Sequence, residues 1–232
     1  MSIPALTQPE LLSIWERGEG ARTTRRALAL LGGTDSTDDA ASMPVGRRDA
    51  SLLDLRVALF GSTFAARTSC PACAEEIELT FDAGEVRRGV PEHEVLEVHV
   101  DDQKIGVRLP STADLAAIES CESVEQARRQ LLARCLDRDP ATLAPHVLAA
   151  IVDAMAESDP QADVSLELTC PECSQAWREP FDIVTFLWSE LATWARHLLA
   201  DVHLLASAYA WSESEILRMT PVRRNAYLEM LR

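Results

Sequence analysis

Two stretches of the chain share one pattern: SCPACAEEIELTFD at residues 69–82 and TCPECSQAWREPFD at residues 169–182. Each stretch contains a Cys-Pro-x-Cys motif, which we call a hook, then seven residues, then Phe-Asp. A two-residue spacer allows one tight turn to direct two thiolates toward the same point, and a zinc-type metal ion takes four such ligands. One hook therefore supplies half of a site. The two hooks, 100 residues apart, predict one complete site at Cys70, Cys73, Cys170 and Cys173.

Zinc is the predicted metal, as one structural ion per chain. Iron is the chemical alternative, because rubredoxin-like proteins use similar hooks, but those usually carry a glycine after the second cysteine. Ala74 and Ser174 stand at these positions, which favours zinc. A thiol–disulfide role is a further alternative, since Cys-Pro-x-Cys also occurs in glutaredoxin-like proteins. There the motif opens a helix that lowers the thiol pKa, whereas the residues after Cys73 alternate between apolar and polar like a strand.

The whole chain predicts a mainly helical α+β fold in three regions. Residues 1–66 are helical, with helices at 7–18, 21–31 and 47–61 and a polar, mobile loop at 32–44. Residues 67–182 form a split zinc-ribbon-like element, in which each hook lies between two strands and the two units pair. The metal is expected to close an insertion, about residues 83–163, at its base. We expect a hairpin at 94–110 in the insertion, and helices at 112–119, 123–136 and 142–157.

Residues 183–232 form the third, helical region. Apolar residues recur at helical spacing from residue 183 to about 209, which predicts one long amphipathic helix. Ser212 with Glu215 is a capping box, and so is Thr7 with Glu10 at the first helix of the chain. Thr220 followed by a proline is a further helix start. The region therefore predicts one long helix followed by two short helices.

Composition points to a folded protein of the cytoplasm. The chain of 232 residues is 47% hydrophobic, but it contains no apolar run near the roughly 18 residues that span a bilayer. Its first residues lack the basic and apolar segments of an export signal. In a reducing compartment, six cysteines favour metal ligands or buried thiols over disulfides.

The net charge of −15 comes from the middle of the chain. Residues 71–182 carry 24 acidic and nine basic side chains, whereas the segments before and after are each balanced. Such a segment repels nucleic acid and anionic membranes. The hooks also suggest a zinc-ribbon protein that binds nucleic acid or regulates its use, but that function needs a basic surface. The acidic surface serves solubility or, alternatively, binds a basic partner.

The sequence offers no catalytic site. Four thiolates leave no open position on zinc for water or for a small-molecule substrate. His93 and His99 lie six apart in a strand region, and His197 and His203 lack the i,i+4 spacing of helical metal ligands. Cys121 and Cys135 fall in separate predicted helices and are expected to be buried thiols. We therefore expect a protein that is not an enzyme.

Four stretches resemble the T4-type baseplate hub assembly chaperone family, in the form found in phage-like contractile injection system clusters. They are LLDLRVALFG before the first hook, VRLPSTADLAAIE, PFDIVTFLW after the second hook, and YAWSESEILRMTPVRRNAYLEML at residues 209–231. Together they cover most of residues 46–232, and the last stretch is the most distinctive. The resemblance implies a non-enzymatic protein that helps to build, or belongs to, the baseplate of a contractile tail. Its partners would then be baseplate or hub proteins.

Aromatic side chains gather in the C-terminal region, although the chain has only five Trp and two Tyr. Large aromatic and arginine side chains are enriched at interface hot spots. The predicted partner-binding residues are Trp188, Trp194, Tyr209, Trp211, Arg223, Arg224 and Tyr227. Ordinary packing of the aromatic rings against the N-terminal helices is the alternative, and exposed arginines are commonly just solvated.

Overall fold

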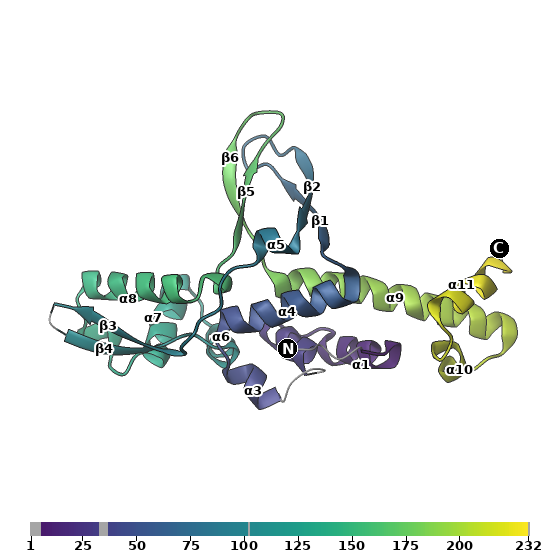
Figure 1. Cartoon of the computed structure of the whole chain (residues 1–232), viewed down its shortest axis with the longest axis horizontal. Coiled ribbons are helices and arrows are strands. Elements are labelled where there is room, and N and C mark those ends of the chain that lie inside the picture. Colours follow the sequence, from purple (N-terminus) through teal and green to yellow (C-terminus); the bar gives the residue numbers. More distant parts are fainter. Residues whose placement is uncertain (1–5, 33–36, 102, 232) are drawn as a thin grey trace.

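Figure 1 shows an elongated helical body from which two β-hairpins project together on one side. This computed structural model describes residues 6–32, 37–101 and 103–231. A separate lobe lies at one end of the body, and the C-terminal helices lie at the other end. The predicted α+β fold, mainly helical with a split four-cysteine element, is confirmed.

The body is built around one hydrophobic core to which the N-terminal helices and α9 both contribute. Its helices are α1 (Gln8–Gly18), α2 (Thr23–Leu31), α3 (Thr37–Ser42), α4 (Val45–Phe60) and α9 (Ile183–Tyr209). Apolar residues recur along the longer helices, so each helix buries one face against the others. The most enclosed side chains include Ile14, Leu30, Leu52, Leu55, Leu187 and Leu191. Residues of the predicted first and third regions therefore share one core.

Capping boxes start two helices where the sequence predicts them. Glu10 accepts hydrogen bonds from the backbone N–H and the hydroxyl of Thr7, each at 2.7 Å. Glu215 accepts the equivalent bonds from Ser212 at 2.8 and 2.7 Å. These bonds satisfy donors that a helix start would otherwise leave unpaired. Both helices begin at the next residue.

The segment predicted as a loop at residues 32–44 contains the helix α3, so the prediction is wrong over residues 37–42. Ala40 is fully buried in the body core, and Met43 packs against the same core. The helix contacts α2 and the lobe helix α6 (Thr112–Ile118). Packing on these neighbours stabilises a helix that composition alone does not favour. Residues 33–36 of this segment lie outside the described part of the chain.

The two projecting hairpins, which we call arm 1 and arm 2, contain the hooks. Arm 1 pairs β1 (Thr63–Ser69) with β2 (Glu76–Asp82), and arm 2 pairs β5 (Ser165–Thr169) with β6 (Ala176–Pro180). Each arm is a separate antiparallel two-stranded sheet within the described residues. The two hook units come together at the four-cysteine cluster, as predicted, but they share no sheet among the described residues. They meet through half-buried side chains that alternate with exposed ones along the strands.

The insertion folds as a lobe with its own hydrophobic core. As predicted, it contains a hairpin, β3 (Val95–Val100) and β4 (Gln103–Arg108), and three helices, α6, α7 (Val124–Cys135) and α8 (Pro145–Ser158). The core residues are Val98, Ile105, Val107, Leu132, Val147 and Ile151. The sequence did not predict the short helix α5 (Ala83–Val86) or the 3-10 turns η1 (Pro140–Thr142) and η2 (Pro160–Ala162).

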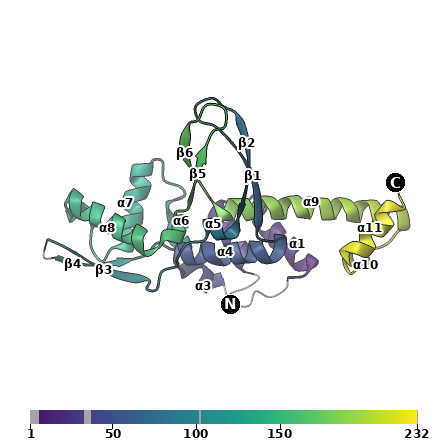
Figure 2. The same cartoon turned by 45° about the horizontal axis from the view of Figure 1, so that its top comes forward.

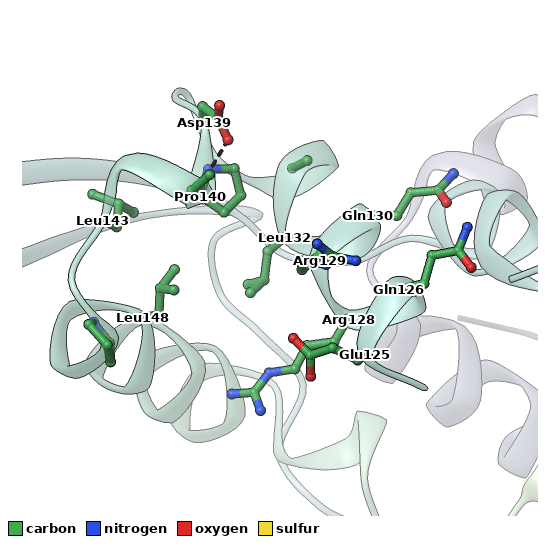
Figure 3. A pocket seen from close by; sticks show the side chains of 13 residues that line it. Glu125, Gln126, Arg128, Arg129, Gln130, Leu132, Asp139, Pro140, Leu143 and Leu148 are labelled. Atoms are coloured by element: carbon green, nitrogen blue, oxygen red, sulfur yellow. Dashed lines mark hydrogen bonds between the residues drawn. The ribbon is translucent and has the colours of Figure 1, made fainter. Parts of the chain in front are cut away.

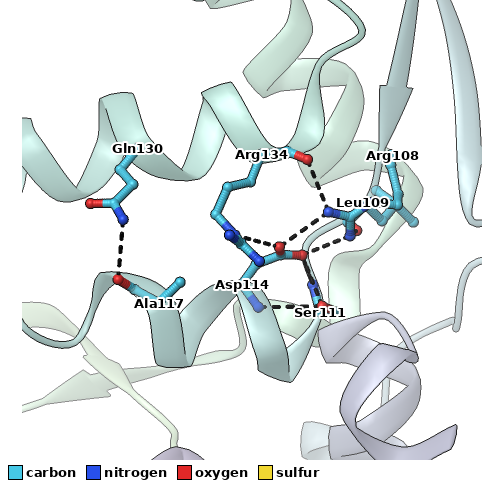
Figure 4. Close-up of polar contacts among 7 residues, drawn as sticks. All are labelled: Arg108, Leu109, Ser111, Asp114, Ala117, Gln130 and Arg134. Atoms are coloured by element: carbon cyan, nitrogen blue, oxygen red, sulfur yellow. Dashed lines mark hydrogen bonds and ion pairs between the residues drawn. The ribbon is translucent and has the colours of Figure 1, made fainter. Parts of the chain in front are cut away.

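A buried carboxylate, Asp114, holds α6, α7 and β4 together (Figure 4). It accepts hydrogen bonds from Arg108 at 2.6 and 3.1 Å and from Arg134 at 2.8 Å. The backbone N–H and hydroxyl of Ser111 donate to it at 2.9 and 2.8 Å. Burial alone would raise the pKa of Asp114, but these bonds outweigh burial and keep that pKa well below its ordinary range.

Polar contacts join the lobe to the body. The backbone N–H of Gly46 in α4 donates to Asp159 at 2.9 Å, and the hydroxyl of Thr24 in α2 donates to Glu119 at 2.7 Å. Gly46 lies so close to η2 that an added Cβ would be 1.7 Å from the Asp159 carboxylate. These contacts close the insertion at its base. The prediction that the metal would do so is wrong, because the hooks are the turns at the far ends of the arms.

The C-terminal part is one long helix and two short helices, as predicted. α9 continues beyond the body, and α10 (Glu213–Leu217) and α11 (Pro221–Glu229) fold back onto its end (Figure 1). Val202, Leu205 and Ile216 form a small core there. Although α9 has 27 residues, no helix in the described ranges is both long and apolar enough to cross a membrane.

Candidate metal centre

The four hook cysteines meet at the tips of the two arms. Cys70 follows β1 and Cys73 precedes β2, while Cys170 and Cys173 occupy the same positions between β5 and β6. Figure 2, a view turned by 45°, shows the two arms meeting at their tips above the helical body. Residues that lie about 100 apart in the sequence are therefore brought together by two hairpins that rise side by side.

Both hooks adopt the same tight turn. The backbone N–H of Cys70 donates to the carbonyl of Glu75 at 2.9 Å, and Cys170 makes the same bond to Gln175 at 2.9 Å. Ala74 and Ser174 have φ angles of 62° and 60°, in the left-handed region that glycine normally occupies. The hooks thus adopt the backbone conformation that glycine adopts with least strain, although neither position is a glycine. This turn directs both sulfurs of a hook to one side.

The sulfur positions fit a tetrahedral metal site. All four sulfurs lie within 4.8 Å of one another. The Sγ atoms of Cys70 and Cys173 are 3.6 Å apart, as are those of Cys73 and Cys170. Four sulfurs at about 2.3 Å from a central zinc ion would lie about 3.8 Å from each other. The spacing is much longer than the roughly 2.0 Å of a disulfide bond, and all four cysteines are free thiols. The cluster could hold a metal ion such as zinc.

The electrostatics of the cluster also suit a cation. Burial opposes ionisation of Cys70, but backbone N–H groups of Cys73 and Ala72 outweigh it and lower the pKa of Cys70 to about 7. The N–H of Glu75 favours the thiolate of Cys73, yet the neighbouring thiols, Cys173 first, raise the pKa of Cys73 to about 12. A first thiolate therefore forms easily, and a second beside it does not. A divalent cation bound between the sulfurs would remove this repulsion.

The Phe-Asp that ends each repeat forms the base of each arm. Phe81 and Phe181 pack edge to face with ring centres 5.6 Å apart, and Phe64 of β1 stacks on Phe81 at 5.1 Å. The next residue in each repeat is a helix cap: Asp82 accepts from the N–H of Gly84 at 3.0 Å, and Asp182 accepts from that of Val184 at 2.9 Å. Seven residues separate each hook from its phenylalanine. The two arms therefore have equal length, so that the sulfurs meet at one end while the rings meet at the other.

A buried arginine anchors this aromatic base to the body. The guanidinium of Arg56 in α4 lies over the ring of Phe64, 3.8 Å from its centre. It also donates to both carboxylate oxygens of Glu190 in α9, at 2.9 and 2.7 Å, and to the carbonyl of Gly61 at 2.6 Å. Such a fork geometry holds a planar guanidinium firmly. Gly61, with φ of 88°, makes the turn from α4 into β1.

Between base and tip the arms touch through Glu179 of β6. Its carboxylate accepts a hydrogen bond from the Thr68 hydroxyl of β1 at 3.1 Å and from the Trp177 indole at 3.0 Å. The outer faces carry one cross-strand ion pair each. Arg67 pairs with Glu78 at 2.5 Å in arm 1. In arm 2 the equivalent positions carry the opposite charges, and Glu167 pairs with Arg178 at 3.1 Å. The predicted pairing of the two hook units did not identify these side-chain contacts.

Two of the residues predicted to bind a partner are buried inside this chain. Trp188 is 4% exposed in the body core, and the guanidinium of Arg26 lies 5.0 Å from its ring centre. Arg224 is 5% exposed; its Nε lies 3.4 Å from Asp201, and it donates to Gln8 at 2.8 Å. Both side chains stabilise the fold and present no free surface to another protein.

The other five are partly or fully accessible. Tyr209, Trp211 and Tyr227 form an aromatic cluster at the end of α9, with ring centres 4.5 to 5.9 Å apart, and each ring is half-buried. Arg223 is exposed and lies 5.9 Å from the centre of the Tyr227 ring. Trp194 is half-buried where α9 packs on α1. A partner role for these five residues stays a prediction.

The remaining cysteines lie apart from the cluster. Among the described residues, only the four hook cysteines have the geometry of a metal site. Cys135 is buried in the lobe, where burial raises its pKa to about 11. Cys121 lies between α6 and α7, not in a helix as predicted; it is half-buried, and its thiol donates to Gln130 at 3.1 Å. Strands follow both hooks, so neither hook has the helix N-terminus that activates redox cysteines.

Comparison with known protein families gives a match over part of the chain. Residues 30–138 match the family described as T4 bacteriophage base plate protein. The matched span is a little under half of the chain and runs from the end of α2 through arm 1 to just beyond α7. It contains the first hook but not the second, and it contains two of the four stretches that carry the sequence resemblance. No curated protein and no solved structure matched the chain.

Proposed function

We propose that this protein is a non-enzymatic assembly factor or component of the baseplate or hub of a phage-like contractile tail or injection system. The match of residues 30–138 to the T4 bacteriophage base plate protein family carries the proposal. The protein acts in the cytoplasm, where its partners are other baseplate or hub proteins. The resemblance of the C-terminal stretch to hub assembly chaperones supports the assembly role.

A structural zinc ion fits this function. Cys70, Cys73, Cys170 and Cys173 would hold the ion with four thiolates, which leaves no coordination position for water or substrate. The ion would supply a rigid link between the arm tips, while Phe64, Phe81 and Phe181 link the arm bases. Two hairpins that are each too small to be stable alone then behave as one stiff projection.

The C-terminal end of the molecule is the surface that we assign to a baseplate or hub subunit. Its aromatic cluster is half-buried, and apolar side chains beside it face solvent: Val222 is 81% exposed and Met230 is 73% exposed. Together with the exposed Arg223, they provide the mixture of aromatic, apolar and arginine contacts that interface hot spots favour. The surface lies far from the metal-linked arms in both views.

Truncation after Ala208 tests the assignment. The change removes the aromatic cluster, α10 and α11, but it leaves the hook cysteines and the body core in place. The truncated protein should keep its zinc and its other helices, yet it should no longer co-purify with baseplate or hub subunits from producing cells. Particle assembly should fail in a strain that carries the truncation.

A milder pair of variants separates binding from folding. Val222→Asp places a charge on the proposed surface, and Val90→Asp places one on an exposed valine of the lobe, 46% exposed. Only Val222→Asp should reduce co-purification, and neither variant should alter thermal stability, because both side chains already face water. Normal particles from the truncated strain, together with unchanged co-purification, would refute the proposed function.

A further inference from the structure

A groove of ≈ 660 Å³ lies between α7, η1 and α8 in the lobe (Figure 3). Its floor is apolar and includes Leu132, Leu143 and Leu148, which surround the open space in the close-up view. Leu132 is buried in the lobe core, whereas Leu143 and Leu148 are half-buried. A groove with this floor fits the apolar face of a helix.

The side of the groove that α7 forms carries two arginines without a partner. Arg128 and Arg129 are exposed, and neither makes an ion pair or side-chain hydrogen bond with any described residue. Four other cations of the lobe pair with carboxylates of the same chain. These are Lys104, Arg108, Arg134 and Arg138. In a chain with a net charge of −15, two free guanidinium groups beside an apolar groove indicate an acidic partner.

The acidic residues of the groove lining have local roles that the arginines lack. Asp139 caps η1, where it accepts a hydrogen bond from the N–H of Ala141 at 2.9 Å. Glu125 lies in the first turn of α7, where a carboxylate stabilises the helix N-terminus. Both carboxylates keep their negative charge but are already placed at helix starts, so Arg128 and Arg129 are the charged groups of the lining left to pair with another molecule.

We infer that this groove binds an acidic amphipathic helix of another protein. Leucine-type side chains of that helix lie on the floor, and its carboxylates pair with Arg128 and Arg129. The groove is in the lobe, at the opposite end of the molecule from the C-terminal surface. The chain can therefore hold two proteins at once, one at each end, and the groove is independent of the C-terminal contact in the proposed function.

Photocrosslinking in producing cells tests the groove directly. A photoreactive phenylalanine analogue replaces Ala133 or Ala141, two exposed alanines of the lining, and, as the control, Ala65 on the outer face of arm 1. Mass spectrometry then identifies the segment attached. Both groove positions should capture the same acidic, amphipathic segment of another protein, and the Ala65 control should not capture it.

Charge reversal provides the quantitative part of the test. A synthetic peptide of the captured segment should bind R128E/R129E protein on the order of tenfold more weakly than wild type, because attractions become repulsions. R25E, which reverses another exposed arginine without an ion pair, should bind like wild type. Exchanging the peptide's acidic residues for lysines should restore binding to R128E/R129E.

Other outcomes overturn the inference. They are the absence of an adduct at both groove positions, an adduct with a basic segment, and an adduct with a second copy of this chain. Binding that R128E/R129E leaves unchanged overturns it as well. Co-purification through the C-terminal surface should survive every groove variant, so failure of the groove inference and failure of the proposed function give different results.

Discussion

Shortening one arm by two residues per strand should greatly weaken metal binding, and shortening both arms equally should restore it. In arm 1 the change is deletion of residues 67–68 and 77–78, which face each other across the hairpin. In arm 2 the equivalent change is deletion of residues 167–168 and 177–178. Deletion in pairs leaves every remaining side chain on its original face of the strand.

The size of the effect follows from the length of the arms. Two strand residues span about 7 Å, whereas metal–ligand distances tolerate only about 0.2 Å. A shortened arm 1 reaches the other hook only if Phe64 and Phe81, which are 0% and 7% exposed, leave the aromatic base. Loss of each buried ring costs about 3–5 kcal/mol. Zinc bound by four thiolates contributes about 10–16 kcal/mol, so the ion still binds, but roughly four or more orders of magnitude more weakly.

Competition with a chelator of known zinc affinity measures this change. The arm 1 variant and the arm 2 variant should each lose zinc at far lower chelator concentration than wild type. The variant with both arms shortened should recover most of the affinity, because its sulfurs and rings are again in register. If a single shortened arm binds zinc as tightly as wild type and the protein melts at the same temperature, base and tip are not coupled and the reasoning is refuted.

Three further predictions concern the lobe, its junction and its charge. Asp114→Asn should lower the free energy of unfolding by about 2–3 kcal/mol. Asp153→Asn should not change the urea midpoint, because Asp153 is exposed on α8 and pairs with no described residue. Because folding lowers the pKa of Asp114, its contribution to the free energy of unfolding is present above about pH 4 and is lost as the pH falls further. If Asp114→Asn and wild type lose the same amount of stability as the pH falls, this reasoning is contradicted. Gly46→Ala should cost about 1–3 kcal/mol by overpacking, and Gly89→Ala, which meets nothing within 4 Å, should cost little; equal urea midpoints would contradict the close approach of α4 to η2. DNA should bind to this protein no better than to an acidic control protein at about 0.15 M salt. Micromolar, salt-sensitive binding in a filter assay would instead support a role in nucleic-acid binding.

Local sequence signals predicted most of the elements. The strands of the arms, the hairpin of the lobe and its three helices follow from alternation and helical spacing, and capping boxes mark the starts of α1 and α10. The spacing of the hooks also predicted correctly that the four cysteines lie together. These features depend on residues close in sequence, or on a metal geometry that is the same in many proteins.

Contacts between distant segments account for what the sequence did not predict. The helix α3 forms because Ala40 is buried against helices from elsewhere in the chain. Burial of Trp188 and Arg224 depends on the N-terminal helices, which supply Arg26 and Gln8. The same holds for the base of the arms. Its phenylalanines were visible in the repeat, but only the fold shows that they meet.

We propose that the architecture of the arms depends on one zinc ion shared by the two hooks. Elemental analysis and X-ray absorption at the zinc edge, on protein purified without chelator, test it most directly. The expected result is about one zinc per chain with four sulfur neighbours at about 2.3 Å. In Cys170→Ser the sulfur number should fall to about three and the melting temperature should drop. Protein without metal, or a Cys170→Ser protein that keeps its zinc and melts like wild type, would contradict the shared site.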